Sequence, residues 1–175
     1  MNRTAIVTGG ARGIGAAITR KLNSLGYNVL VNYNTSEERA IKLKEELGVE
    51  IYKADVSDYN QVKAMVDYCV ERFGKIDLLV NNAGFGDRTD FLEMDIDFQI
   101  QMTEVNCNSA LYLTRMFLPP MVEHNEGHII NVASIAGFMP GPFMATYHAT
   151  KGYLLLLGEA ISYELRKTKV KLLTL

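Results

Sequence analysis

The 175-residue chain has no tryptophan, two cysteines and three histidines. Cys69 and Cys107 are far apart in the sequence, and we expect both to be reduced, buried thiols of a cytosolic protein. The histidines (His124, His128 and His148) have no cysteine or acidic partners at the spacing of metal ligands. The composition therefore argues against a disulfide framework and against a metal site.

The chain also lacks an excess of charge and a long hydrophobic run. Its net charge is −2, which makes nucleic acid and anionic membranes poor partners. The apolar run from Tyr153 to Leu157 is far shorter than the roughly 20 residues of a membrane-spanning helix. We do not expect the first residues to be a signal peptide. We therefore expect a cytoplasmic protein with one domain over residues 1–175 and no nucleic-acid or membrane partner.

Strand-like and helix-like segments alternate along the whole chain. Strands are expected at residues 4–8, 28–33, 49–53, 76–80, 128–133 and 170–173. Helices are expected at 14–25, 36–47, 58–73, 96–123 and 146–167, and the helix over 96–123 should be disturbed near Pro119-Pro120. This alternation predicts an α/β fold: a Rossmann-type, doubly wound parallel sheet in three layers, with six strands in the order 3-2-1-4-5-6.

Three glycines, Gly9, Gly13 and Gly15, lie between the first expected strand and the first expected helix. Glycines permit a tight turn and a close approach of the backbone, and the helix N-terminus offers unpaired amides to a pyrophosphate. A glycine-rich turn without a ligand is the alternative. The strand–turn–helix setting favours a bound nucleotide.

The end of the second strand should determine the choice of cofactor. An acid there would bind a ribose 2′-hydroxyl, but the run 32–36 contains no acid before Glu37. Arg12 in the glycine loop can meet a 2′-phosphate, and Asn34, Thr35 and Ser36 can donate hydrogen bonds to it. We therefore favour NADP (NADPH) over NAD. The alternatives are a solvated Arg12 and a Ser36 that only caps the next helix.

Two later strands also end in polar or small residues. Asp55 follows the third strand and can accept a hydrogen bond from an adenine amino group, although a turn or capping role explains it equally well. Asn82, Ala83 and Gly84 follow the fourth strand. Small residues there let the backbone pass close to a bound ribose.

Tyr147 and Lys151 are four residues apart, which places them on one face of a helix. An ammonium group near a phenol favours the phenolate, so Tyr147 can exchange a proton with a carbonyl oxygen near neutral pH. A tyrosine–lysine pair at this spacing is common on ordinary helices. It gains meaning from Ser134, 13 residues earlier, and from the glycine loop.

These motifs together resemble those of the short-chain dehydrogenase/reductase family. The matching features are Thr8-Gly9, Gly13-Ile14-Gly15, Asp55-Val56, Asn81-Asn82-Ala83-Gly84, Asn106, Ser134, Tyr147 and Lys151, and they cover nearly all of the chain. The first part is similar to the 3-oxoacyl-acyl-carrier-protein reductases. The stretch 130–138 resembles a broader group, which leaves the substrate open.

The resemblance implies a role for each residue of the catalytic set, Asn106, Ser134, Tyr147 and Lys151. Lys151 would also bind the nicotinamide ribose, Ser134 would bind the substrate oxygen, and Asn106 would hold a water that links Lys151 to solvent. The residues expected to bind the cofactor are Gly9, Arg12, Gly13, Ile14, Gly15, Tyr33, Asn34, Thr35, Ser36, Asp55, Val56, Asn82, Ala83, Gly84, Tyr147 and Lys151. Thr150 and His148 are expected to pack or to lie at the surface.

The sequence thus predicts an NADP(H)-dependent oxidoreductase that interconverts a small-molecule ketone and a secondary alcohol. Chains of this family continue past the position of Leu175, so we expect the C-terminal substrate-covering segment and the last strand to be lacking. A non-catalytic nucleotide-binding scaffold and an NAD-dependent alcohol dehydrogenase remain as alternatives. The resemblance also implies a homo-oligomer, a dimer or tetramer, in the full-length parent.

Overall fold

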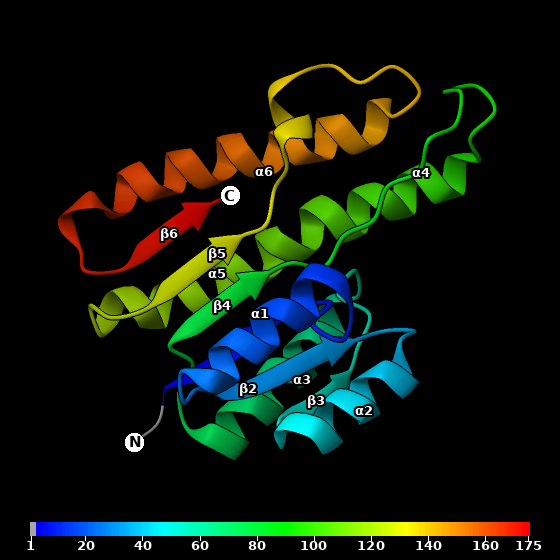
Figure 1. The fold of residues 1–175 in the computed structure, drawn as a ribbon. Helices are drawn as coiled ribbons and strands as arrows, with labels where there is room; N and C mark the ends of the chain where they lie inside the picture. Colours follow the sequence, from blue (N-terminus) through cyan, green and yellow to red (C-terminus); the bar gives the residue numbers. More distant parts are fainter. Residues whose placement is uncertain (1–2) are drawn as a thin grey trace.

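A computed structural model of the chain describes residues 3–175. Six parallel strands form one sheet in the order β3-β2-β1-β4-β5-β6, which confirms the predicted topology (Figure 1). The strands are β1 (Thr4–Val7), β2 (Asn28–Tyr33), β3 (Glu50–Lys53), β4 (Leu78–Asn81), β5 (His128–Asn131) and β6 (Lys171–Thr174).

Helices cover both faces of the sheet. They are α1 (Gly13–Ser24), α2 (Glu37–Leu47), α3 (Tyr59–Phe73), α4 (Ile96–Thr103), α5 (Ser109–Glu123) and α6 (Ala145–Glu164). Buried side chains of α1 and α2 pack on one face, and those of α3 and α5 pack on the other. Figure 1 shows α6 lying alongside β6, at the end of the sheet opposite to β3.

The period-two alternation of the strands builds these two cores. Leu30, Ile6, Leu79, Ile129 and Leu172 are paired in register from β2 to β6 and form one buried row across the sheet. Each such side chain contributes roughly 1.5–3 kcal/mol on burial. A slip of one residue would move a strand's apolar set to the opposite face, so this row strongly specifies the register.

The structure refines one local expectation and does not show one alternative. The helix over residues 96–123 is not broken at Pro119-Pro120, which lie inside α5. These prolines only deprive the carbonyls of Arg115 and Met116 of their helical donors. The helix is instead rewound at Glu104–Asn108, where one π-helical turn separates α4 from α5. The other difference concerns Ser36, which precedes α2 but makes no capping hydrogen bond with its side chain.

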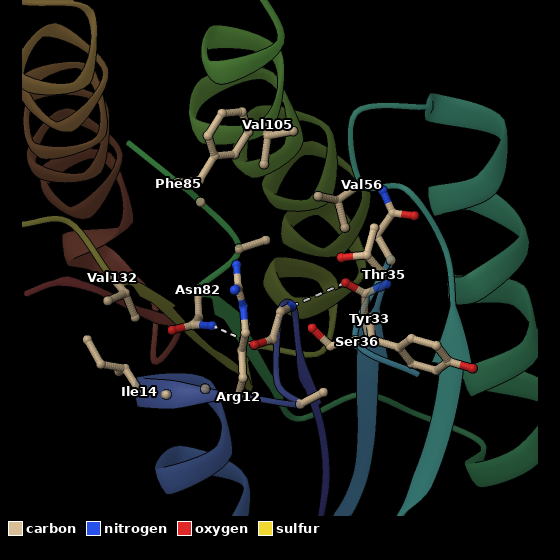
Figure 2. Close-up of a pocket in the computed structure, with 18 of the residues that line it drawn as sticks. Arg12, Ile14, Tyr33, Thr35, Ser36, Val56, Asn82, Phe85, Val105 and Val132 are labelled. Atoms are coloured by element: carbon tan, nitrogen blue, oxygen red, sulfur yellow. Dashed lines mark hydrogen bonds between the residues drawn. The ribbon is translucent and has the colours of Figure 1, made fainter. Parts of the chain in front are cut away.

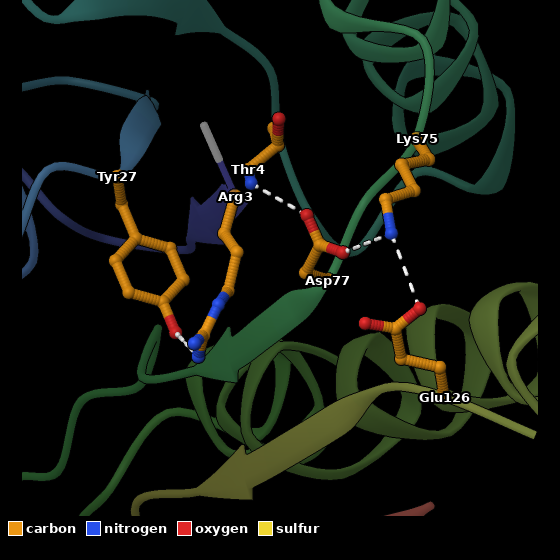
Figure 3. Close-up of polar contacts among 6 residues, drawn as sticks. All are labelled: Arg3, Thr4, Tyr27, Lys75, Asp77 and Glu126. Atoms are coloured by element: carbon orange, nitrogen blue, oxygen red, sulfur yellow. Dashed lines mark hydrogen bonds and ion pairs between the residues drawn. The ribbon is translucent and has the colours of Figure 1, made fainter. Parts of the chain in front are cut away.

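A buried carboxylate joins three strands at their N-terminal ends (Figure 3). Asp77 is 6% exposed, and its Oδ2 accepts a hydrogen bond of 2.7 Å from the Thr4 amide. Its Oδ1 lies 2.8 Å from Nζ of Lys75, which also approaches Glu126 at 3.3 Å. The backbone of Asp77 bonds to Thr4 on one side and to His128 on the other. Asp77 therefore links the starts of β1, β4 and β5.

We predict that Asp77→Ala lowers the free energy of unfolding by about 2 kcal/mol, because the Thr4 amide loses a charged acceptor. Asp77→Asn keeps an acceptor and should lose less. Glu126→Gln, which alters only an exposed ion pair, should change stability by less than about 1 kcal/mol. Urea unfolding followed by circular dichroism measures all three variants. Equal losses for Asp77→Ala and Glu126→Gln would contradict this role of Asp77.

Candidate functional site

A cavity of about 790 Å³ opens at the carboxyl ends of the strands, between the glycine loop and α6 (Figure 2). It has the volume of a site for a small ligand or cofactor. The structure brings every residue predicted to bind the cofactor into its lining: Gly9, Arg12, Gly13, Ile14, Gly15, Tyr33, Asn34, Thr35, Ser36, Asp55, Val56, Asn82, Ala83, Gly84, Tyr147 and Lys151. Residues from opposite ends of the chain therefore meet at one surface.

The glycine loop is shaped to bring backbone close to a ligand. Gly9 and Gly13 have φ angles of 60° and 50°, which favour glycine. A Cβ on Gly15 would overlap the Gly9 carbonyl and lie 2.6 Å from Nδ2 of Asn82. Helix α1 begins at Gly13, and Arg12 before it makes no side-chain cap bond. The first-turn amides therefore retain their capacity to bind an anion, and the loop fits a pyrophosphate.

Two asparagines hold this loop in place. Asn82 donates from Nδ2 to the carbonyl of Thr8 at 2.8 Å and to that of Gly9 at 3.2 Å. Asn32 accepts from the Gly9 amide at 3.2 Å and donates to Ala54 at 2.9 Å. We did not single out Asn32 from the sequence. The only sequence signal for this role of Asn32 was its position near the end of a strand, at the same end of the sheet as the glycine loop.

The surface near the end of β2 is basic on the side of the cavity. Arg12 lies between Asn82 and the Thr35–Ser36 turn in Figure 2. Arg39 of α2 also lines the cavity and was missed from the sequence, because it lies three residues beyond the strand-end run. Glu37 does not line the cavity. It approaches Lys53 at 3.5 Å and the Tyr33 hydroxyl at 3.5 Å.

Asp55 has structural partners within its own loop. Its Oδ1 accepts from the amide of Ser57 at 2.9 Å and from its hydroxyl at 2.6 Å, which is a turn of the kind that aspartate favours. Its Oδ2 accepts from Nδ2 of Asn34 at 3.0 Å. The turn role of Asp55 is therefore visible, and its contact with an adenine stays a prediction.

Tyr147 and Lys151 line the other end of the cavity from successive turns of α6. The Lys151 amine lies 5.8 Å from the centre of the Tyr147 ring and donates to the carbonyl of Val132 at 2.9 Å. Lys151 is only 5% exposed, and this burial lowers the pKa of its amine. Burial raises the pKa of the neighbouring Cys107 thiol to about 11, so that the thiol is neutral at pH 7. The Lys151 amine thus lies beside a neutral thiol and a backbone carbonyl.

Asn106 lies in the π-helical turn and joins two parts of the site. Its Oδ1 accepts from the Phe85 amide at 3.0 Å, and its Nδ2 donates to the Phe85 carbonyl at 2.8 Å. The same Nδ2 donates to the Thr150 hydroxyl at 3.0 Å, and that hydroxyl donates to the carbonyl of Tyr147 at 2.8 Å. The Asn106 side chain therefore binds protein groups directly. Its predicted link to a water stays a prediction.

Ser134 follows β5 and begins a short 3₁₀ helix, Ile135–Phe138. Its hydroxyl accepts from the Ala136 amide at 3.1 Å. Neither Ser134 nor Asn106 lines the cavity, whereas the adjacent Ala133 does. The predicted contact of Ser134 with a substrate oxygen is therefore a hypothesis about the bound state. Four further apolar or amide side chains line the cavity: Phe85 and Met144, which the sequence offers as candidates for a substrate pocket, and Gln101 and Val105, which it does not.

Within residues 3–175, no group of three or more histidine, cysteine or acidic side chains is arranged to hold a metal ion. The same residues contain no helix with the length and apolar character needed to cross a bilayer. Both cysteines are free and buried.

Comparison with known proteins agrees with this geometry. The family model described as short chain dehydrogenase matches residues 3–175. A 3-oxoacyl-(acyl-carrier-protein) reductase of Staphylococcus aureus is 36% identical over 170 residues, covering 94% of this chain and 69% of its own length. Among solved structures, a metagenomic short-chain oxidoreductase in complex with NADP is 34% identical with a TM-score of 0.92, over 98% of this chain and 80% of its own. A short-chain dehydrogenase/reductase from Burkholderia phymatum in complex with NAD is 32% identical with a TM-score of 0.90, over 97% and 63%.

The buried amine generates a prediction about stability and pH. Below its folded pKa, Lys151 is protonated in both the folded and unfolded states, and the full cost of burying its charge is present. As the pH rises from that value toward the usual 10.5, the unfolded state binds more protons, so this residue's effect is to raise stability with pH. We predict that Lys151→Met removes this contribution, a slope of at most about 1.4 kcal/mol per pH unit.

The unfolding free energies of the parent and of Lys151→Met, measured between about pH 7 and 10, give the difference in their slopes against pH. Lys167→Met removes an exposed amine and should keep the parental slope. A Lys151→Met variant whose stability follows pH as the parent's does would contradict the burial effect.

Proposed function

The chain belongs to the short-chain dehydrogenase/reductase family of oxidoreductases, and from this premise we propose that it interconverts a ketone and a secondary alcohol with NADP(H). One observation carries the proposal: Tyr147 and Lys151 line the same cavity as the glycine loop. A pyrophosphate at the N-terminus of α1 would leave the rest of a dinucleotide to extend toward these two residues. A bound nicotinamide would supply or accept the hydride.

The chain's own residues handle the proton. Tyr147 gives its phenolic proton to the carbonyl oxygen in the reductive direction, or takes it back in oxidation. The Lys151 amine, fixed by the Val132 carbonyl, lies 5.8 Å from the centre of the Tyr147 ring and would place positive charge beside the proton transfer. Ser134 orients the substrate oxygen, and Lys151 with Asn106 resupplies the proton to Tyr147.

The basic rim favours NADP over NAD. Arg12 and Arg39 line the cavity together with Thr35 and Ser36, and a guanidinium is well suited to a phosphate. No acidic side chain of α2 lines the cavity to accept a ribose 2′-hydroxyl. These positions fit a 2′-phosphate between the glycine loop and the start of α2.

The catalytic end of the cavity fits a largely apolar carbonyl compound. Phe85, Val105 and Met144 offer apolar contacts, and Gln101 adds an amide. This lining is compatible with a 3-oxoacyl substrate, which the name of the S. aureus relative indicates for that protein.

We also propose a cytoplasmic homo-oligomer. Leu156 and Tyr163 on the outer face of α6 are 74% and 67% exposed, and apolar side chains of this size suit contact with a second copy.

We predict that Tyr147→Phe lowers turnover at least about 100-fold, because the phenylalanine ring has no proton to transfer. NADPH affinity should stay within about threefold, since the glycine loop and the basic rim are unchanged. Oxidation of NADPH with a panel of small ketones, together with a fluorescence titration of NADPH, separates the two effects. Retained turnover would reject the assignment. NADPH binding without oxidation in the parent would favour a scaffold.

A second prediction concerns the basic rim. The double change Arg12→Ala and Arg39→Ala should weaken NADPH binding at least about tenfold, because charge-assisted bonds to the 2′-phosphate are lost. NADH binding should change much less. Arg166→Ala, which removes an arginine outside the cavity, is the matched control. If both cofactors lose affinity equally, the arginines do not read the 2′-phosphate.

A further inference from the structure

Two loop glycines lie against the rings of neighbouring residues on α6. A Cβ built on Gly86 would lie 2.8 Å from Cγ and 3.0 Å from Cε2 of Tyr147, and would overlap Cδ2 between them. A Cβ on Gly141 would overlap the ring of His148 in the same way. Neither glycine has a φ in the left-handed region, so the backbone itself would accept alanine at both positions. Ring contact is therefore the constraint at each.

We propose that Gly86 is a positioning residue for Tyr147: its missing side chain lets the loop after β4 close against the phenol ring and hold it facing the cavity. Tyr147 lies in the first turn of α6 and is only partly buried. A tyrosine ring restrained only by its own helix can change rotamer. The Gly86 backbone supplies the opposing wall.

The loop that carries Gly86 is anchored on both sides. Immediately before it, Phe85 is held through its amide and its carbonyl by the side chain of Asn106. Beyond it, the Thr89 amide donates to the carbonyl of Phe143 at 3.0 Å, and the Arg88 guanidinium lies 5.9 Å from the centre of the Phe143 ring. The backbone at residue 86 thus has little freedom to move away from a larger side chain.

The backbone of Tyr147 is also connected to Asn106. The Thr150 hydroxyl links Asn106 to the carbonyl of Tyr147. A methyl group at residue 86 must therefore be accommodated mainly by rotation of the ring, and rotation changes the position of the hydroxyl relative to the Lys151 amine, which lies 5.8 Å from the ring centre. This step to catalysis rests on the proposed function, whereas the ring contact does not.

The ring contact can be tested without turnover. Ring-labelled tyrosine gives an NMR signal for each tyrosine, and Tyr147→Phe identifies the signal of residue 147 by its loss. We expect Gly86→Ala to shift that signal by more than about 0.1 ppm, because the packing on the ring changes. Gly141→Ala presses on the His148 ring, which lies 6.2 Å from the Tyr147 ring, and should therefore shift the Tyr147 signal less than Gly86→Ala does. A Tyr147 signal unchanged in Gly86→Ala would overturn the proposal.

Kinetics with NADPH and ethyl acetoacetate, a small 3-oxo ester, then test the consequence. Gly86→Ala should lower kcat at least about tenfold, with the Kd for NADPH within about twofold and a Tm close to the parent's. Gly86→Ser should be at least as impaired, and Gly141→Ala should keep kcat within about twofold. Equal losses in Gly86→Ala and Gly141→Ala would overturn the positioning role.

The two hypotheses fail separately. If Tyr147→Phe retains the parent's turnover, or the parent has none, the proposed function fails, and the NMR shift alone decides whether Gly86 positions the ring. If Tyr147→Phe is inactive and Gly86→Ala keeps full kcat, only the positioning role fails.

Discussion

The arrangement of the site depends on the buried amide of Asn106. Its two hydrogen bonds to Phe85 fix the loop after β4, and its third, to Thr150, fixes the first turns of α6. The glycine loop is tied to the residues following β4 by Asn82, and Tyr147 and Lys151 lie on α6. Asn106 therefore sets the separation between the nucleotide end and the chemical end. Leaving this buried amide unpaired would cost about 1–3 kcal/mol. Its three hydrogen bonds, two to Phe85 and one to Thr150, therefore support one another.

The π-helical turn explains how a helix residue can reach both partners. A regular α-helix through residues 96–123 would satisfy its own backbone and present its side chains at a uniform spacing. The wider turn at Glu104–Asn108 changes the direction of the side chains that follow, and such turns often occur at functional sites. It also places the buried Cys107 thiol 3.8 Å from the carbonyl of Thr150. Burial of the Lys151 amine beside this turn lowers its pKa, and the buried charge costs stability.

What could be predicted from the sequence was local. The parallel α/β sheet followed from alternating elements, its strand order was that of the Rossmann type, and Tyr147 and Lys151 were brought together by helical periodicity. The glycine loop was readable because its residues are contiguous. Contacts between distant segments were not readable: Gly86 lies 61 positions before Tyr147, and Asn106 lies 44 positions before Thr150. Arg39 was missed because a helix brings it back to the cavity. The rule that proline removes a helical donor drew attention to Pro119-Pro120. It could not show that the helix stays continuous there, or that the helix is rewound at Glu104–Asn108.

The N-terminal ends of the strands contribute to stability, and their C-terminal ends carry the candidate site. At the N-terminal ends, the Asp77 carboxylate satisfies the first amide of β1 and ties β1 to β4. At the C-terminal ends, the strands carry amides such as Asn32, Asn81 and Asn131, whose side chains bond to loops and to one another. A parallel sheet must end its hydrogen-bond ladder somewhere, and side-chain amides supply some of the partners at these ends. The pairing is incomplete, because the buried Oδ1 of Asn81 and the Thr174 hydroxyl have no hydrogen-bond partner in the part of the chain that the structure describes. The loops that follow the C-terminal ends of the strands can approach a ligand, because contacts at the N-terminal ends hold the strands together.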